Sequence, residues 1–464
     1  MSEDSKGGSD LQNRSDDENF GISTNLFHAV EDALEESRDS EVEDLVEGLH
    51  EADTADLLET LGREERYRLM EVMGAGFDPE ILPYLDDTVR EEIVEWLGPQ
   101  GIAKLVPSLD SDDAVELVQD LDEDLRIHIL AALPQAYRRV IEESLRYPED
   151  SAGRLMQREM VAVPSVWTIG ETIDYMRVSD SLPDDFYDIF VVDPRHHPVG
   201  FIPASRVMRA RRHVRLDEVM DDDMRVIPLA LDQEDVAHMF RQYGLISAPV
   251  VEESGRLVGV ITVDDVVDVI DEEAGDDLMK MGGVTEPDLY EDVADTTIAR
   301  FTWLAVNLLT AVLASFVISL FDATIEKVVA LAVLMPIVAS MGGNAGTQTL
   351  TVAVRSLAMK DLSEANAARF VGKELIIGII NGVLFAVLTG GVTWLWFDEL
   401  ALALVIGAAM IINMIIAGLC GTLIPLGLER FEIDPAVASS VFLTTVTDVI
   451  GFFAFLGLAA IFLL

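Results

Sequence analysis

The sequence predicts a multidomain membrane protein. An all-α helical-repeat domain and an α/β pair of repeated modules precede a connecting helix and an α-helical transmembrane domain with five helices. Three observations indicate this fold class. Leucine or methionine recurs every twelve residues from Leu49 to Leu145, segments within 150–273 repeat each other, and five nearly uncharged runs follow Arg300.

Composition also changes near Arg300. The 464-residue chain carries 83 acidic and 32 basic side chains, and only 11 and 7 of these fall in residues 300–464. The net charge is therefore −47 before residue 300 and −4 after it. Acid spread over the whole first part, with far more arginine than lysine, is also typical of a protein adapted to concentrated salt.

The first 24 residues are rich in Ser, Asp, Gly and Asn and contain few large apolar side chains. This composition predicts a disordered acidic tail. The segment also lacks the apolar core of a signal peptide, so no cleavable signal is expected there.

Residues 25–149 are predicted to form a helical-repeat domain. Units such as "LDSDDAVELVQDL" begin with an Asp or Pro that caps a helix, and two or three turns then bury Leu, Val and Ile. Short helices of this kind stack into a solenoid. The positions that define the period are Leu49, Leu61, Met73, Leu85, Leu97, Leu109, Leu121, Leu133 and Leu145.

Residues 150–273 contain a second internal repeat. "MVAVPSVWTIGETIDYMR" matches "MRVIPLALDQEDVAHMFR", and "VVDPRHHPVGFIPASRVM" matches "VVEESGRLVGVITVDDVV". Each copy alternates short strands with helices, and the segment resembles a tandem pair of CBS domains. That resemblance implies a regulatory role and, in many pairs, binding of ATP or another adenine nucleotide.

The ribose-holding pattern of CBS domains is intact only in the second copy, at Gly259, Thr262 and Asp265. A carboxylate at the last position can accept hydrogen bonds from both ribose hydroxyls. In the first copy the matching residues are Pro203 and Arg206, which cannot do so. Nucleotide binding at Thr262 and Asp265 is one expectation, and a structural or metal-sensing pair is the other.

A connecting helix is expected over residues 274–299. The stretch "DDVVDVIDEEAGDD" leads into it and places several carboxylates within about three helical turns, where residues three and four apart are neighbours. Like charges this close repel each other, so bulk cations or bound divalent ions must screen them.

Five runs in residues 300–464 are each longer than the roughly 20 residues that cross a bilayer as a helix. Most basic residues of this part, including Arg355 and Lys373, fall at one end of the runs, and only Lys327 lies at the other. The positive-inside rule then predicts a cytoplasmic amino-terminal part and an outward carboxyl terminus. The runs are Phe301–Phe321, Val328–Val354, Leu375–Phe397, Ala401–Leu428 and Pro435–Leu464.

The second run contains "MPIVASMGGNAGTQTLTVAV", an unusual composition for a membrane helix. Pro336 lacks a backbone N–H, so we expect a locally irregular helix there. Irregular backbone at membrane depth is tolerated where it is buried in protein or lines a watery cavity. Close helix packing through small residues is the alternative. The residues proposed to line a pore are Pro336, Gly342, Gly343, Asn344, Gly346, Thr347 and Gln348.

The fifth run holds one ionisable group after its first turn, Asp448, about halfway along. A lone carboxylate at the bilayer midplane is costly unless it faces water, a partner or a cation. Ser440 and Thr444 lie on or near the same side by helical spacing. No membrane-embedded Lys or Arg is available, so a cation is the simplest partner.

These motifs, preceded by a helical repeat and a CBS pair, resemble the MgtE family of magnesium transporters. The resemblance rests on "MPIVASMGGNAGTQTLTVAVRSLA" and "TTVTDVIGF" and covers nearly the whole chain. It implies a homodimeric Mg²⁺-selective channel in the cell membrane, with Asp448 as the central metal-binding carboxylate. Influx would follow the electrochemical gradient into the cytosol.

The resemblance further implies that cytosolic Mg²⁺ closes the pore by bridging acidic faces of the helical domain, the CBS pair and the connecting helix. Linkage requires that the ion bind the closed form more tightly. For any single acid, a solvated surface group is the alternative. The matching positions are Glu80, Asp112, Glu116, Asp265, Asp268, Glu273, Asp276 and Asp277.

Several functions are not expected. The sequence has no P-loop, no Ser-His-Asp pattern and a single cysteine, Cys420, so neither an enzyme nor an ATP-driven pump is predicted. A nucleic-acid partner is not expected either. Two alternatives stay open: transport of Co²⁺, Mn²⁺ or divalent cations in general, and a membrane-anchored CBS sensor.

Overall fold

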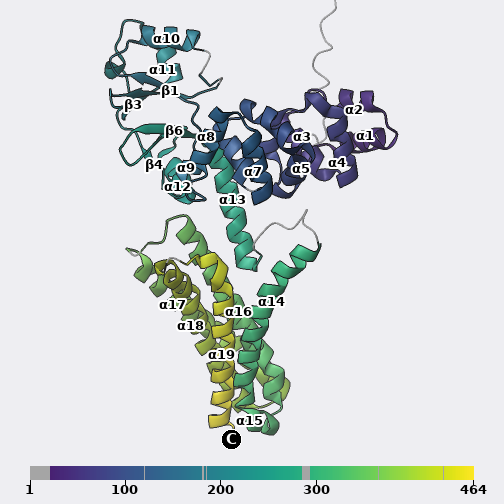
Figure 1. Cartoon of the computed structure of the whole chain (residues 1–464). Helices are drawn as coiled ribbons and strands as arrows, with labels where there is room; N and C mark the ends of the chain where they lie inside the picture. The colour runs from purple at the N-terminus through teal and green to yellow at the C-terminus, as the bar shows by residue number, and fades with distance from the viewer. Residues whose placement is uncertain are drawn as a thin grey trace, which may run out of the picture. The chain divides into compact units, whose positions relative to one another are not determined.

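The computed structural model describes residues 21–119, 121–179, 182–183, 185–284, 293–363, 365–431 and 433–464. The chain divides after Asp268 into two compact units, unit 1 (Met1–Asp268) and unit 2 (Val269–Leu464) (Figure 1). Nearly all of the predicted tail, residues 1–24, lies outside the described residues, and so does 285–292 of the predicted connecting helix.

Short helices joined by tight turns form the first part of unit 1, as the twelve-residue period predicts. Leu61, Leu85, Leu109 and Leu133 each follow the last residue of a helix and are at most 8% exposed. The elements are α1 (Thr24–Glu35), α2 (Asp39–Val46), α3 (Glu51–Thr60), α4 (Arg63–Met73), η2 (Gly74–Gly76), η3 (Pro79–Tyr84), α5 (Asp87–Leu105), η4 (Val106–Ser108), α6 (Ser111–Gln119), α7 (Glu123–Ala132) and α8 (Gln135–Ser144).

Two buried arginines tie successive helices of this solenoid together. Arg66 of α4 bonds to Glu92 of α5 at 2.5 Å, and Arg90 of α5 bonds to Glu116 of α6 at the same distance. Both pairs join residues 26 apart. The second pair therefore repeats the first two units later, and it compensates a buried guanidinium with a carboxylate.

The remainder of unit 1 consists of two three-stranded sheets with identical topology. In each, the first strand pairs parallel with the second and the second antiparallel with the third, with a register shift at Val191/Val192 and at Val250/Val251. The elements are α9 (Ala152–Leu155), β1 (Val161–Pro164), α10 (Ile169–Val178), β2 (Asp188–Val192), β3 (Pro198–Pro203), α11 (Ala204–Arg209), η5 (Leu216–Glu218), β4 (Ile227–Pro228), α12 (Gln233–Tyr243), β5 (Ser247–Val251) and β6 (Leu257–Thr262).

The two copies also exchange backbone hydrogen bonds. Gln157, which precedes the first copy, pairs with Val260 of β6, and Asp221, which precedes the second, pairs with Phe201 of β3. Buried residues of both copies share a hydrophobic cluster that includes Phe190 and Leu257. The repeat found in the sequence is therefore a pseudo-symmetric pair.

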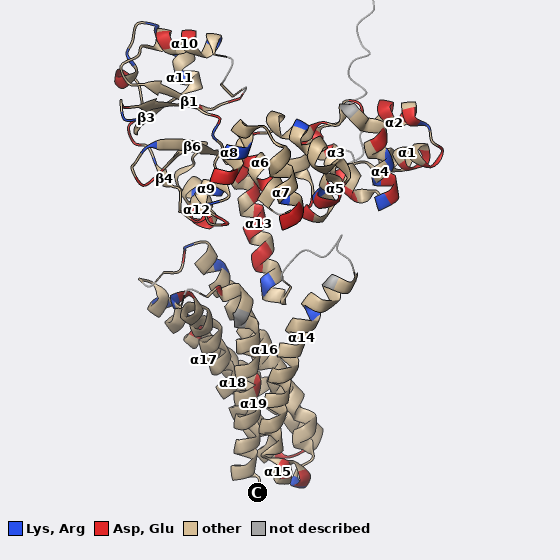
Figure 2. Cartoon of the chain, in the orientation of Figure 1, with Lys and Arg blue, Asp and Glu red and all other residues tan. Residues whose placement is uncertain are grey.

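Unit 2 is helical, and its helices hold few charges (Figure 2). Among the described residues, five helices are long and apolar enough to cross a membrane, as predicted. Its elements are the larger part of α13 (Val263–Gly282), then α14 (Val293–Ser319), α15 (Asp322–Lys327), α16 (Ala330–Ala358), α17 (Ala367–Phe397), α18 (Leu400–Arg430) and α19 (Pro435–Phe462).

Helix α18 forms the centre of the bundle. It packs against α16, α17 and α19, and more than half of its apolar core window is buried, compared with a third or less in the other four. Glycines allow close approach, because a Cβ at Gly378 of α17 would lie 2.9 Å from the Met414 carbonyl oxygen. Helix α14 exposes leucines along its length, as a lipid-facing helix does.

Two predictions differ from the structure. The acidic helix does not begin near residue 274, because α13 starts at Val263, directly after β6, and ends at Gly282. The backbone around Pro336 is not irregular, because α16 continues through it as one helix. Pro336 is the seventh residue of α16 and removes the N–H that would bond to the Ala332 carbonyl oxygen, yet the helix continues on both sides of it.

Candidate cation sites

One face of α16 is polar and uncovered in the chain. Asn344, Thr347 and Gln348 are exposed, and the last two lie three and four residues after Asn344, so they share this face. Ser340 and Pro336, further toward the start of the helix, are exposed as well. Polar groups on a membrane-spanning helix need water or protein around them.

The glycines of the same segment divide between two faces. A Cβ at Gly346 would lie 2.8 Å from Leu443 of α19, and a Cβ at Gly342 would lie 2.2 Å from the Asn413 amide. Both glycines are buried and serve helix packing within the chain, and their place in a pore lining stays a prediction. Gly343 has open space beside it, which is compatible with the polar face.

Asp448 lies on α19 and is half-buried. Thr444, one turn earlier, is exposed, and Ser440 is half-buried. The ion pairs described in unit 2 join Lys280 to Asp276 and to Asp434, and neither includes Asp448. The carboxylate thus has no described basic partner, as the sequence indicated.

Contacts at three glycines fix how α19 is aligned along α16. Gly346 meets Leu443, and Gly342 and Gly451 both meet the side chain of Asn413 on α18. Asn344 lies between the two glycines of α16, and Asp448 lies between Leu443 and Gly451 on α19. The Asn344 amide and the Asp448 carboxylate therefore lie between the same contacts of the two helices.

A second concentration of carboxylates lies in unit 1, where α6 meets the first turn of α13. Burial and then the neighbouring Glu116 and Asp265 raise the pKa of Asp113 to about 8. Burial, with smaller contributions from nearby carboxylates, raises the pKa of Asp265 to about 6. Burial and then Asp265 raise the pKa of Asp112 well above its ordinary value. These acids repel each other when ionised.

The other predicted regulatory acids differ in their surroundings. Burial and then Asp110 raise the pKa of Glu80, so it belongs to the same acidic region. Glu116 also forms the ion pair with Arg90, so part of its charge is already compensated, and its role as a metal ligand stays a prediction. Among the described residues, no group of three or more acids or histidines is arranged to hold a metal ion.

The remaining acids of this prediction lie on α13. Asp276 pairs with Lys280 at 3.3 Å, and the same lysine reaches Asp434 at 3.4 Å. Burial and then Asp434 raise the pKa of Asp277. Lys280 therefore already compensates part of the charge predicted to bind metal here. Asp268 and Glu273 also lie on α13.

The raised pKa values predict a pH-dependent stability. Between the ordinary pKa of about 4 and the folded-state value of about 8, the folded state binds more protons than the unfolded state. Without divalent cations, the melting temperature of the transition that unfolds unit 1 should therefore decrease as the pH is raised from about 5 to about 8.5. Mg²⁺ should restore it more at the higher pH, because only ionised carboxylates bind the ion.

Calorimetry of the full chain in detergent, with chelator or with Mg²⁺, measures this. Asp113→Asn is the matched variant, and its pH dependence should be weaker. An Mg²⁺ effect that is equal at both pH values, or absent, would contradict the assignment of this acidic region.

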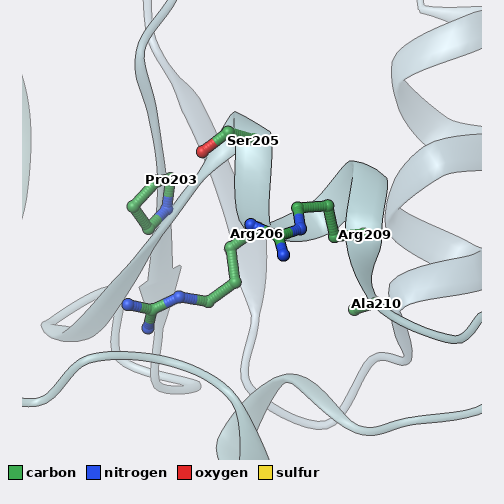
Figure 3. A pocket seen from close by; sticks show the side chains of 5 residues that line it. All are labelled: Pro203, Ser205, Arg206, Arg209 and Ala210. Carbon is green, nitrogen blue, oxygen red and sulfur yellow. The ribbon is translucent and has the colours of Figure 1, made fainter.

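The two copies of the CBS pair present different chemistry. In the second, the Thr262 hydroxyl donates to Asp265 at 2.8 Å. In the first, a cavity of about 450 Å³ is lined by Pro203, Arg206 and Arg209, and both arginine side chains extend from α11 (Figure 3). Arg206 donates to the Val219 carbonyl oxygen at 3.1 Å. The ribose-binding carboxylate is absent there, as the sequence indicated.

Comparison with known proteins agrees with this organisation. A family model described as "Divalent cation transporter", MgtE, matches residues 335–458, the MgtE intracellular N domain matches 49–150, and a CBS domain matches 216–272. The magnesium transporter MgtE of Thermus thermophilus is 34% identical over 70% of this chain and 73% of its own length. The chain belongs to the MgtE family.

Other relatives are similar in extent. The magnesium transporter MgtE of Enterococcus faecalis is 31% identical over 70% of this chain and 71% of its own. A solved cytosolic domain of the Mg²⁺ channel MgtE in complex with ATP is 29% identical, covers 52% of this chain and 99% of its own, and has a TM-score of 0.49.

The MgtE transmembrane region also contains buried polar side chains that the sequence analysis did not single out, among them an acid and an amide. Glu374 of α17 is 7% exposed and accepts a hydrogen bond from Thr349 of α16 at 3.1 Å. It was missed because the third apolar run appeared to begin at Leu375, one residue later. Asn413 of α18 is fully buried, and its only signal was an amide within an apolar run.

Proposed function

We propose that this MgtE-family protein is a homodimeric channel that carries Mg²⁺ into the cytosol down its electrochemical gradient. One observation carries the proposal. The carboxylate of Asp448, for which the described residues offer no basic partner, lies in the same stretch of the bundle as the exposed polar face of α16. A second copy facing this surface would enclose a water-filled path between the two α16 and the two α19 helices.

The chemistry of that path suits a hydrated divalent ion. Mg²⁺ gives up its bound water molecules reluctantly and prefers octahedral coordination by oxygen. Two Asp448 carboxylates related by a two-fold axis would match its charge. The side chains of Asn344, Thr347, Gln348 and Thr444 would hold its water molecules. The names of the relatives, magnesium transporters, favour Mg²⁺ over Co²⁺ or Mn²⁺.

We further propose that the acidic region of unit 1 senses cytosolic Mg²⁺. Repulsion among Asp112, Asp113 and Asp265 disfavours the described arrangement when all are ionised, and a divalent ion would offset this repulsion. The ion then stabilises that arrangement by its binding free energy. If this arrangement accompanies a shut pore, internal Mg²⁺ closes the channel.

The proposed topology places unit 1 in the cytosol and the carboxyl terminus outside, in the plasma membrane. The support is the positive-inside pattern of the loops. ATP binding at Thr262 and Asp265 stays a prediction. In the structure, the Asp265 carboxylate accepts from both the amide and the hydroxyl of Thr262 and lies beside Asp112.

Flux into proteoliposomes tests the transport function. Purified full-length protein should admit Mg²⁺ without ATP or a proton gradient, and uptake should follow the imposed membrane potential. Parallel measurements with Mn²⁺, Co²⁺ and Ca²⁺ define selectivity. Protein that admits none of these ions would instead support the membrane-anchored sensor.

A further inference from the structure

Asn413 occupies the junction of the three central helices. It lies on α18, is fully buried, and donates from its Nδ2 to the Val338 carbonyl oxygen of α16 at 2.7 Å. Its Oδ1 is buried and has no hydrogen-bond partner among the described residues. A buried unpaired amide oxygen in a membrane bundle is unfavourable, so this residue is not explained by stability alone.

Glycines on two other helices accommodate the Asn413 side chain. A Cβ at Gly342 of α16 would lie 2.2 Å from Nδ2, and a Cβ at Gly451 of α19 would lie 3.0 Å from the same atom. At both glycines the three nearest atoms belong to Asn413. The backbones of α16 and α19 therefore rest directly against one amide group.

These two glycines flank the residues of the proposed ion path. Gly342 lies two positions before Asn344, and Gly451 lies three positions after Asp448. Both helices are rigid over so short a distance. The contacts at Asn413 therefore set the separation between the side chains of Asn344 and Asp448. Octahedral hydrated Mg²⁺ tolerates little change in that separation.

We propose that Asn413 is a positioning residue that sets the spacing of α16 and α19, and through it the ion selectivity of the pore. This inference rests on the proposed function, because it assigns the selectivity of the same path. Oδ1 has no hydrogen-bond partner among the described residues, so a buried water molecule is its expected partner.

A double-mutant cycle in the full-length protein tests the contact. Gly451→Ala places a methyl group against Asn413 and should lower maximal Mg²⁺ flux roughly tenfold while changing the Mg²⁺/Ca²⁺ flux ratio. In the Asn413→Ala background the same substitution has space and should change flux by less than about threefold. Gly391→Ala on α17, where a Cβ meets nothing within 4 Å, is the matched control and should behave as wild type.

Asn413→Leu separates the polar contact from the volume of the side chain. It should fold and keep measurable flux but shift the Mg²⁺/Ca²⁺ ratio, because Val338 loses its hydrogen bond. A wild-type ratio in Asn413→Leu, or additive effects in the cycle, would overturn the inference.

Measuring the melting temperature of each variant in detergent separates a failure of the proposed transport function from a failure of the proposed role of Asn413. Non-additive melting temperatures, with no Mg²⁺ flux in the wild type, would contradict the transport function but confirm the contact. Normal wild-type flux with additive effects throughout would contradict only the role of Asn413.

Discussion

Asp448→Asn is expected to lower Mg²⁺ flux at least about a hundredfold, the size of effect seen when one member of a desolvated charge pair is neutralised. The amide has nearly the same shape as the carboxylate, so packing on α19 is retained. In the proposed dimer the substitution removes both negative charges, and a hydrated +2 ion then meets only neutral oxygens. Proteoliposome flux under an imposed potential measures the effect.

Two further measurements make this result specific. Light scattering in detergent should give the same dimer mass as wild type, since the side chain is only half-buried. Asp398→Asn is the matched control, because Asp398 ends α17 with a positive φ of 52°, which asparagine also adopts readily. That variant should conduct normally. Normal Mg²⁺ flux in Asp448→Asn would exclude the proposed pore site.

Neutralising Asp112, Asp113 and Asp265 together to asparagine should make channel closure insensitive to internal Mg²⁺. Removing the three charges removes both the repulsion that opposes the described arrangement and the groups that a divalent ion would bridge, so the ion no longer shifts the equilibrium. Burial and then mutual repulsion raise the pKa values of these acids, so they interact with each other, and we expect the shift of open probability with Mg²⁺ concentration to shrink at least about tenfold. Patch recordings with Mg²⁺ on the internal face measure this shift.

The control for this variant tests whether a change in net charge alone affects closure. Neutralising Asp222, Asp223 and Glu253, which are exposed acids of the CBS pair, changes net charge equally and should leave closure unchanged. Glu273, Asp276 and Asp277 of α13 form a separate variant, because Lys280 already pairs with Asp276. Closure that is intact in the first variant and lost in this one would place the sensor on α13.

Much of the fold follows from local pattern. The apolar runs predicted five membrane helices because a helix in hydrocarbon must be apolar over its whole length, whatever its neighbours. The repeats predicted the solenoid and the paired sheets, since each unit must bury the same face against the next. Asp448 stood out for a similar reason, as a charge at midplane needs a partner in any packing.

What the sequence analysis missed has a common physical origin. Helical spacing alone did not separate Gly342 and Gly346, which are buried against α18 and α19, from Gly343, which has open space beside it. The pairing of Glu116 with Arg90 was not visible in the sequence because it joins helices that are distant along the chain. Glu374 appeared to lie outside the third run, although packing against Thr349 buries it.

The sequence by itself determined the order of domains, the five membrane segments and the carboxylate at their middle, because these depend on length, period and the cost of charge in lipid. Only the tertiary structure decided which side of α16 is free, which acids are already paired and that Asn413 joins three helices. Those facts depend on neighbours brought together by folding, and side chains at the same helical spacing have different neighbours.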